Sequence, residues 1–193
     1  MNYFIILLLS IAFAISSCKQ VQKSSVAESS VSKELENQKM QLDSTWNVMF
    51  QSDDNKIENL NRLVKELQMI DGSNSGLLTL AEKEIQSIKG FRYDQNSMRI
   101  SRNIDIYDSV TNGVIQKLRN ETNQNPNAIK YQIVNQLISE IQLADDSILF
   151  YRKEYDRTVD SYNNFLKTRN KDLKKSGINV DSLKPYPVFR LLM

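Results

Sequence analysis

The chain has 193 residues, a net charge of +2, no histidine and a single cysteine. This near-neutral balance gives no general affinity for polyanions, so the sequence predicts no nucleic-acid partner. The lack of histidine removes the usual near-neutral acid–base catalyst and the commonest metal ligand, and one cysteine cannot form an intrachain disulfide. The composition therefore favours a protein that is not an enzyme and that holds no cofactor or metal.

The N-terminus begins with an uncharged apolar run at residues 3–15. The run is shorter than the roughly 20 residues that a membrane-spanning helix needs, and it is typical of the hydrophobic region of a signal peptide. The next residues, Ile15-Ser16-Ser17-Cys18, resemble the bacterial lipobox, in which the thiol is diacylated and the chain is cut before the cysteine. We therefore expect residues 1–17 to be a lipoprotein signal peptide, cut between Ser17 and Cys18, and Cys18 to bind the membrane through its lipid.

The alternative to this prediction is a plain signal peptide with an incidental cysteine, or a short membrane anchor, because no lysine or arginine precedes the apolar run. Residues 18–31 are rich in Ser, Lys and Gln and poor in large apolar side chains, so they are expected to form a flexible tether. Lys19 differs from the aspartate that retains some lipoproteins in an inner membrane. The expected location is the extracytoplasmic side of the bacterial envelope, at the outer membrane if the cell has one.

The first predicted helix covers about residues 32–70. Its apolar side chains recur at helical spacing, and the chain contains no proline before Pro126 to interrupt it. Residues 71–76 then concentrate Asp, Gly, Ser and Asn, which are typical of turns. Gly72 suits the left-handed conformation that often ends a helix.

The second predicted helix covers about residues 77–122, although its apolar stripe weakens around Gly90 and between residues 101 and 105. Asn125-Pro126 suits the start of a third helix, because asparagine is a good N-cap and proline a good first helical residue. The third helix is expected to run from residue 128 to about Lys175 and to stop at Ser176-Gly177.

The third segment has the clearest repeat, since apolar residues recur every seven positions at Val134, Ile141, Ile148, Tyr155 and Tyr162. Such a stripe makes a seam for packing against other helices. Three segments of similar length joined by short turns predict an all-α fold, an elongated antiparallel bundle of three long helices in residues 32–175. Residues 176–193 would be a C-terminal extension. A four-helix bundle is the alternative if the second helix breaks near residue 101.

The third predicted helix also carries Glu140-Ile141, Asp145-Asp146-Ser147-Ile148, Arg152, Tyr155-Asp156, Val159 and Tyr162-Asn163. These residues resemble the signature of the LemA family, roughly E-L-x-x-T-E-N-x-I-x-x-x-R-x-x-Y-N-x-x-V-x-x-Y-N. Trp46 and residues 57–60 resemble the family's W and I-P-N-L elements, and residues 184–189 resemble its K-P-x-P-Y-F ending. The chain departs from the family in its lipobox, in residues 75–125 and in an apparent insertion at 172–184. The resemblance implies a long-helix domain outside the cytoplasm of a bacterium, with no settled enzymatic activity.

Three charged residues interrupt the apolar seams: Asp53 in the first predicted helix and Asp145 and Arg152 in the third. If these two helices run in the same direction and end near Ile70 and Lys175, Asp53 and Arg152 lie at about the same height. Because a buried charge needs a partner, we expect an Asp53–Arg152 ion pair in a buried polar layer that fixes the helix register. A ligand or metal site is the alternative, although carboxylate-bridged metal bundles use Glu-x-x-His pairs.

The end of the third predicted helix is basic, with Lys167, Arg169, Lys171, Lys174 and Lys175, and the tail beyond it contains Tyr186 and Phe189. Cations at this position complement the helix dipole. An up-down-up bundle would also place them at the end away from the lipid, together with the tail and the 71–76 turn. A basic surface there could contact a protein partner or an anionic cell-wall polymer.

The sequence therefore predicts a lipid-anchored, non-enzymatic helical scaffold or interaction module that resembles LemA. Its expected partners are the membrane, through lipidated Cys18, and another protein of the envelope. The alternative function is a module that binds a cell-wall glycan or an anionic polymer through the basic residues at 167–175.

Overall fold

The computed structural model describes residues 3–189, with side chains from Ser30 onward. Helices are the only regular elements in residues 3–189, which confirms the all-α prediction. The expected signal peptide, its cleavage site at Ser17 and Cys18, and most of the 18–31 tether lie outside the residues with described side chains, so they stay predictions. Among the helices with described side chains, none is long and apolar enough to cross a membrane.

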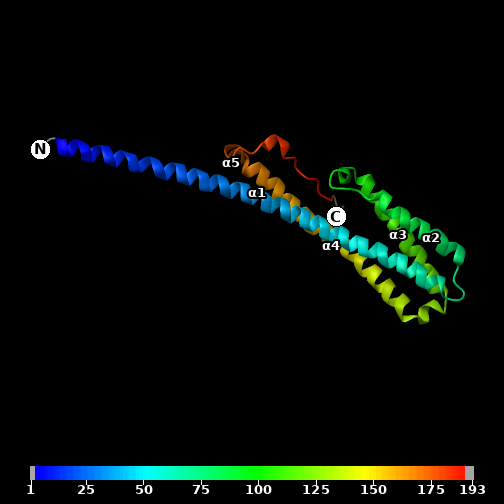
Figure 1. The fold of residues 1–193 in the computed structure, drawn as a ribbon. Coiled ribbons are helices and arrows are strands. Elements are labelled where there is room, and N and C mark those ends of the chain that lie inside the picture. The colour runs from blue at the N-terminus through cyan, green and yellow to red at the C-terminus, as the bar shows by residue number, and fades with distance from the viewer. Residues whose placement is uncertain (1–2, 190–193) are drawn as a thin grey trace. The chain divides into compact units, whose positions relative to one another are not determined.

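The helices are α1 (Tyr3–Gln68), α2 (Ser75–Ile88), α3 (Ser101–Gln124), α4 (Gln132–Thr168) and α5 (Asn170–Lys175), as Figure 1 shows. Single 3-10 turns cover Lys89–Phe91, Ser97–Arg99, Ala128–Lys130 and Val180–Ser182. The chain divides into two compact units. The terminal unit is Met1–Gln41 with Asp160–Pro185, and the central unit is Leu42–Val159 with Tyr186–Met193.

The predicted second helix is interrupted between α2 and α3, in residues 89–100. There the Asp94 carboxylate accepts hydrogen bonds from the backbone N–H groups of Asn96 at 2.9 Å and Ser97 at 2.6 Å. Such local bonds offer the backbone an alternative to the helix, and Gly90 also lowers helix propensity. The polar residues that weaken the apolar stripe therefore form a connection, and α3 begins at Ser101.

Helices α1 and α4 run antiparallel in the central unit. Residue numbers fall along α4 as they rise along α1, as shown by the side-chain pairs Thr45–Thr158 at 2.9 Å, Lys56–Asp145 at 3.3 Å and Asn59–Glu140 at 3.0 Å. The prediction that the first and last long helices run in the same direction is therefore wrong. The physical reason is the connection at 89–100, which adds one reversal of the chain before α4 begins.

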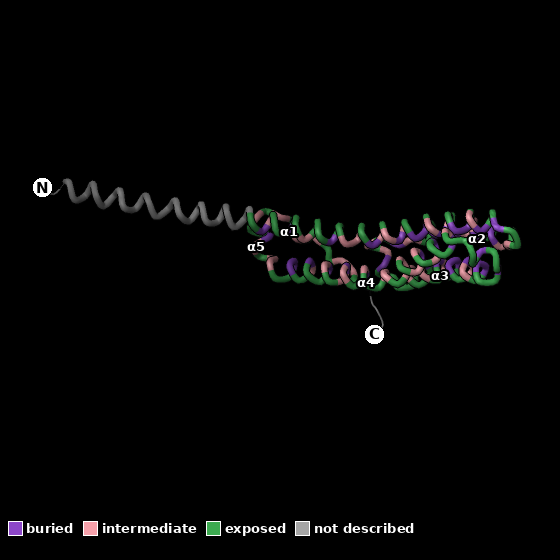
Figure 2. Tube along the Cα trace, turned by 90° about the horizontal axis from the view of Figure 1, so that it is seen from below, coloured by how far each residue is buried: buried purple, intermediate pink, exposed green. Residues whose placement is uncertain are grey.

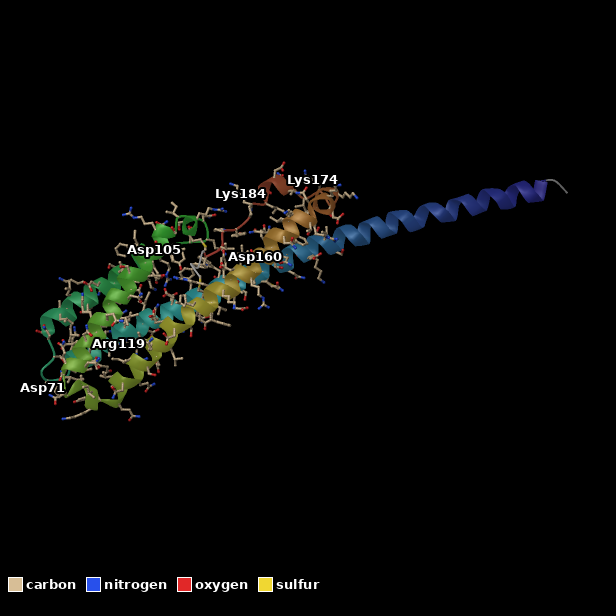
Figure 3. The ribbon with its side chains drawn as sticks, turned by 180° about the vertical axis from the view of Figure 1, so that it is seen from behind. Asp71, Asp105, Arg119, Asp160, Lys174 and Lys184 are labelled. Atoms are coloured by element: carbon tan, nitrogen blue, oxygen red, sulfur yellow. The ribbon has the colours of Figure 1, made fainter. Side chains whose placement is uncertain are left out.

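Two turns meet at one end of the central unit, the α1–α2 turn and the α3–α4 turn. Buried Asn125 donates hydrogen bonds to the Asp71 carbonyl at 3.3 Å and to Ser73 Oγ at 3.0 Å. Gly72 has a φ of +85°, which confirms its predicted left-handed conformation. Figure 3 labels Asp71 at this end of the unit and Asp105 toward the other end of α3.

The core of the central unit lies on the sides of the helices that face one another (Figure 2). Its largest fully buried side chains are Leu42, Met49, Leu60, Leu63, Leu67, Leu78, Ile85, Ile88, Leu118, Leu137 and Tyr155. Full burial of one such aliphatic side chain stabilises a fold by about 1.5–3 kcal/mol. The apolar stripes of the sequence are therefore mainly this core.

The terminal unit has a smaller core of its own. Its buried side chains are Val31, Leu35, Tyr162, Phe165, Leu166 and Leu173. Ser161 Oγ donates a hydrogen bond to Gln38 Oε1 at 3.0 Å, and Arg169, just after α4, lies 3.9 Å from Glu34, so α1 and α4 are antiparallel neighbours in this unit as well. Helix α5 ends at Lys175, just before Gly177, whose φ is +75°.

Candidate functional site

A pocket of about 350 Å³ opens in the central unit. Helices α1, α3 and α4 and the 89–100 connection contribute its lining. Its charged lining residues are Asp53, Lys56, Asp108, Asp145, Asp146 and Arg152. The volume lies at the lower end of the roughly 300–1,000 Å³ of small-molecule pockets. The three predicted polar residues, Asp53, Asp145 and Arg152, therefore come together at one cavity.

Asp53 is at the buried side of the pocket and is 4% exposed. Its Oδ2 accepts hydrogen bonds from Arg92 Nη2 at 2.8 Å and from the Tyr107 hydroxyl. Its Oδ1 lies 3.3 Å from Lys56 Nζ but accepts no hydrogen bond. One carboxylate thus connects α1 to the 89–100 connection and to α3.

Lys56 is also buried, and its ammonium group is shared between two carboxylates. Nζ lies 3.3 Å from Asp53 Oδ1 and 3.3 Å from Asp145 Oδ1. The side chain of Lys56 is 5% exposed, whereas that of Asp145 is 29% exposed and reaches the opening. The single positive charge of Lys56 is therefore divided between the carboxylates of Asp53 and Asp145.

Arg152 forms a bidentate pair with Asp108, with Nη1–Oδ2 at 2.8 Å and Nη2–Oδ1 at 2.6 Å. Its Nη2 also donates to the Tyr93 hydroxyl at 3.2 Å, and its buried Nε has no hydrogen-bond partner. The predicted Asp53–Arg152 ion pair is wrong, because each residue has other partners. In the antiparallel register, Asp53 is level with α4 residues between Asp145 and Thr158, so both side chains still line the pocket.

Burial and charge hold protons on several polar groups near the pocket. Burial raises the pKa of Tyr93 to about 12, and it also raises the pKa of Tyr107, where the Asp53 carboxylate adds to the effect. Burial disfavours the charged Arg152 guanidinium, but the hydrogen bonds and charge of Asp108 outweigh it and raise the Arg152 pKa. These three groups therefore keep their protons at neutral pH.

The lining carries more negative than positive charge. Its four aspartates face two cations, Lys56 and Arg152, so two negative charges are in excess. Arg92 pairs with Asp53 at 2.8 Å from outside the lining, and Asp54, which also contacts Arg92, has Lys89 at 3.3 Å as a second cation. Arg92 therefore offsets one of these two charges. Among residues 30–189, no group of three or more His, Cys, Asp or Glu side chains is arranged to hold a metal ion. The carboxylates are thus spread around the cavity.

An aromatic cluster borders the charged residues; we define it as Trp46, Phe50, Tyr93, Tyr155 and Phe189. Ring centroids are separated by 4.6 Å for Trp46–Phe50, 5.0 Å for Trp46–Tyr155 and 5.6 Å for Tyr155–Phe189. The Phe189 N–H donates to Asp156 Oδ1 at 2.7 Å, and its ring lies 5.1 Å from the Arg152 guanidinium. Residues 186–189, predicted as part of an extension, therefore join the central unit.

The predicted distal interaction surface needs correction. Arg169 lies 3.9 Å from Glu34, in the part of α1 that follows the expected tether, so the basic residues lie beside that end and not at the far one. Lys174 and Lys184 belong to the same unit (Figure 3). Lys167, Lys171, Lys174 and Lys175 are exposed, whereas Phe189 is buried and Tyr186 partly so. The error follows from the reversed direction of α4.

Sequence reasoning missed Lys56, Arg92, Tyr93, Tyr107 and Asp108. Lys56 follows Asp53 by one helical turn, and this spacing was a usable signal for a pair on one face. Arg92 and Tyr93 lie in the 89–100 connection, where the apolar periodicity fails, and Tyr107 and Asp108 lie in α3, whose direction the connection sets. Their positions in space depend on the backbone path of residues 89–100, and the spacing of apolar residues does not predict that path.

Comparisons of the chain with models of protein families, with curated proteins and with solved structures find no match. The resemblance to LemA therefore stays a prediction, supported by the sequence motifs described above.

Proposed function

We propose that this chain is a lipid-anchored, non-enzymatic protein of the bacterial envelope that resembles LemA and acts as an interaction module. Cys18 would carry the lipid, the tether would separate it from the helices, and the central unit would recognise a partner in the envelope. The outer membrane is the proposed location if the cell has one.

One observation carries this proposal: stretches that resemble LemA but lie far apart in the sequence meet in the aromatic cluster beside the pocket. Trp46 comes from the first stretch, Arg152 and Tyr155 from the second, and Phe189 from the last. Trp46 and Phe189 rings stack with centroids 6.5 Å apart, and Phe189 lies against both Arg152 and Tyr155. These stretches pack together around Arg152, which lines the pocket, and this supports a recognition role for the pocket.

Binding is favoured over acid–base catalysis by the chemistry of the pocket. A general acid or base works best when its pKa lies near the working pH. The pKa values of Tyr93, Tyr107 and Arg152 are all raised further from neutrality. Tyr107 and Arg152 already donate hydrogen bonds to Asp53 and Asp108, so these groups are suited to holding the shape of the pocket and not to transferring protons.

We also infer that the central unit is a four-helix bundle built from α1, α2, α3 and α4. Glu84 on α2 pairs with Lys117 on α3, and Glu121 accepts a hydrogen bond from the Asn74 N–H at 2.7 Å, so α2 and α3 run antiparallel. Helix α2 begins at Ser75, near the end of α1, and Arg92 beyond its other end lies 2.8 Å from Asp53, so α2 runs back along α1. With α1 and α4 also antiparallel, every consecutive pair of helices reverses direction. This order supports the four-helix alternative over three long helices.

Photo-crosslinking in intact cells tests the proposed function. A photo-reactive residue replaces Asn112, which is exposed and lines the pocket, and in a matched control it replaces Asn120, exposed on the same helix outside the lining. We expect a discrete protein adduct from position 112 and none from position 120. The same adducts from both positions, or from neither, would contradict a recognition role for the pocket.

Two further experiments test the lipid anchor and the alternative function. Labelling with a fatty-acid analogue should be lost in Cys18→Ala, and label that survives the change would remove the lipid anchor from the proposal. A photo-reactive residue at Lys171 examines the exposed basic residues of the terminal unit. A smear into cell-wall material from position 171, with no adduct from position 112, would favour the glycan-binding alternative.

A further inference from the structure

The pocket of the central unit holds carboxylates that its own cations do not neutralise. Asp53 pairs with Arg92 at 2.8 Å and shares the Lys56 ammonium group with Asp145, and Asp108 pairs with the Arg152 guanidinium. Asp146 has only an uncharged partner, because its Oδ1 accepts a hydrogen bond from Gln142 at 2.7 Å. The uncompensated charge therefore lies on the α4 side, at Asp146, next to Asp145, whose cation Lys56 is shared with Asp53.

A buried hydrogen-bond acceptor inside the pocket also indicates that the carboxylates lack enough positively charged partners. Asp53 Oδ1 is inaccessible to solvent and accepts no hydrogen bond, although Lys56 Nζ lies 3.3 Å away. Buried polar atoms in native proteins are nearly always hydrogen-bonded, so an exception calls for an explanation. Lys56 Nζ donates its hydrogen bond to Asp145 Oδ1 instead, at 3.3 Å. An ammonium group bound at Asp145 would leave Lys56 free to donate to Asp53.

The size and walls of the pocket restrict the ligand. The cavity of about 350 Å³ is far larger than a metal ion, and the acidic side chains in residues 30–189 are not clustered to hold one. Met49, Ile148 and Leu149 form an apolar part of the lining, and Phe50 adds an aromatic face. Such a lining suits an apolar stem, while the carboxylates suit a charged nitrogen at its end.

We propose that the pocket binds an organic cation, a primary ammonium group carried on an apolar stem, with the ammonium near Asp145 and Asp146. This inference rests on the proposed recognition role of the pocket and adds its ligand class. The shared chemistry is found in free alkyl diamines and in lysine side chains of a partner protein. Electrostatic complementarity also favours the encounter, because a cleft with an excess of negative charge attracts cations.

The test is isothermal titration calorimetry on the full chain in detergent, at low ionic strength, with cadaverine as the probe. Cadaverine should bind, and pentanediol and glutarate, which match its stem but not its charge, should not. Asp146→Asn should weaken cadaverine binding by about tenfold or more, because a charged hydrogen-bond acceptor is lost. Asp146 is exposed, so this change leaves the core intact.

Asp105→Asn is the matched control, since Asp105 is an exposed aspartate of α3 outside the lining. It should leave cadaverine binding unchanged. Absence of cadaverine binding, equal binding of pentanediol, or an unchanged affinity in Asp146→Asn would each overturn the proposal, and preferential binding of glutarate would do so by showing a site for anions. If the crosslink at position 112 forms while cadaverine fails to bind, only the ligand class is wrong.

A second titration separates the two sources of the ammonium group. The probe is lysine blocked at its α-amino and carboxyl groups, which presents the side chain as a protein does. Tighter binding of the blocked lysine than of cadaverine supports the proposal with a lysine of a partner protein as the source. Tighter binding of cadaverine supports it with a free diamine as the source.

Discussion

Replacing Asp53 with alanine is expected to lower the free energy of unfolding by about 3 kcal/mol. Removal of one member of a buried ion pair typically costs about 3–5 kcal/mol, because the remaining charge stays buried without a partner. The lower end applies here, since Lys56 would keep Asp145 at 3.3 Å and Arg92 would keep Asp54 at 2.9 Å. Tyr107 would also lose the carboxylate that accepts its hydroxyl hydrogen bond.

Urea unfolding followed by circular dichroism at neutral pH measures this effect. Asp43→Ala is the control, because Asp43 is an exposed aspartate on the same helix. Its expected change is within about 0.5 kcal/mol, as for most surface substitutions. Equal unfolding midpoints for the two variants would show that Asp53 does not carry the buried charge network.

Two substitutions of Tyr155 are expected to differ strongly in their effect on the free energy of unfolding. Tyr155→Ala should cost about 3–5 kcal/mol, the usual cost of deleting a buried aromatic ring. The ring is 0% exposed and packs against Trp46 and Phe189. Tyr155→Phe should be neutral or slightly stabilising, because the buried hydroxyl has no hydrogen-bond partner.

The same urea measurement separates the ring from the hydroxyl. Phe150→Ala serves as the control for loss of an aromatic side chain on the same helix, since Phe150 is 60% exposed. It should have a much smaller effect than Tyr155→Ala. A loss of stability in Tyr155→Phe as large as in Tyr155→Ala would mean that the hydroxyl, and not the packing of the ring, holds this part of the unit together.

The helical class and the residues of the seams could be read from the sequence, but the direction of the last long helix could not. The seven-residue repeat of α4 places Tyr155 on a buried face, and that face is the same whichever way the helix runs. Direction depends on how often the chain reverses before α4. The reversal was hidden at residues 89–100, where Asp94 and its neighbours bond locally and leave no apolar period.

The same limit explains the mixed result for the polar residues. Asp53 and Arg152 were singled out because charges in an apolar seam need partners, and both do line one pocket. Of their actual partners, Arg92 comes from the poorly periodic 89–100 connection and Asp108 from α3, which this connection positions. Pairing among charges depends on short distances in the folded state, which spacing along one helix does not report.

A disulfide between α1 and α4 tests most directly whether their antiparallel register builds the pocket. The variant Thr45→Cys with Thr158→Cys, in a chain that also carries Cys18→Ala, should form the crosslink under mild oxidation, since the two hydroxyls lie 2.9 Å apart. In the parallel arrangement, residue 45 would instead be level with residue 150, about 12 Å along the helix from residue 158. Crosslinking of Thr45→Cys with Phe150→Cys, and not with Thr158→Cys, would contradict the register and the pocket with it.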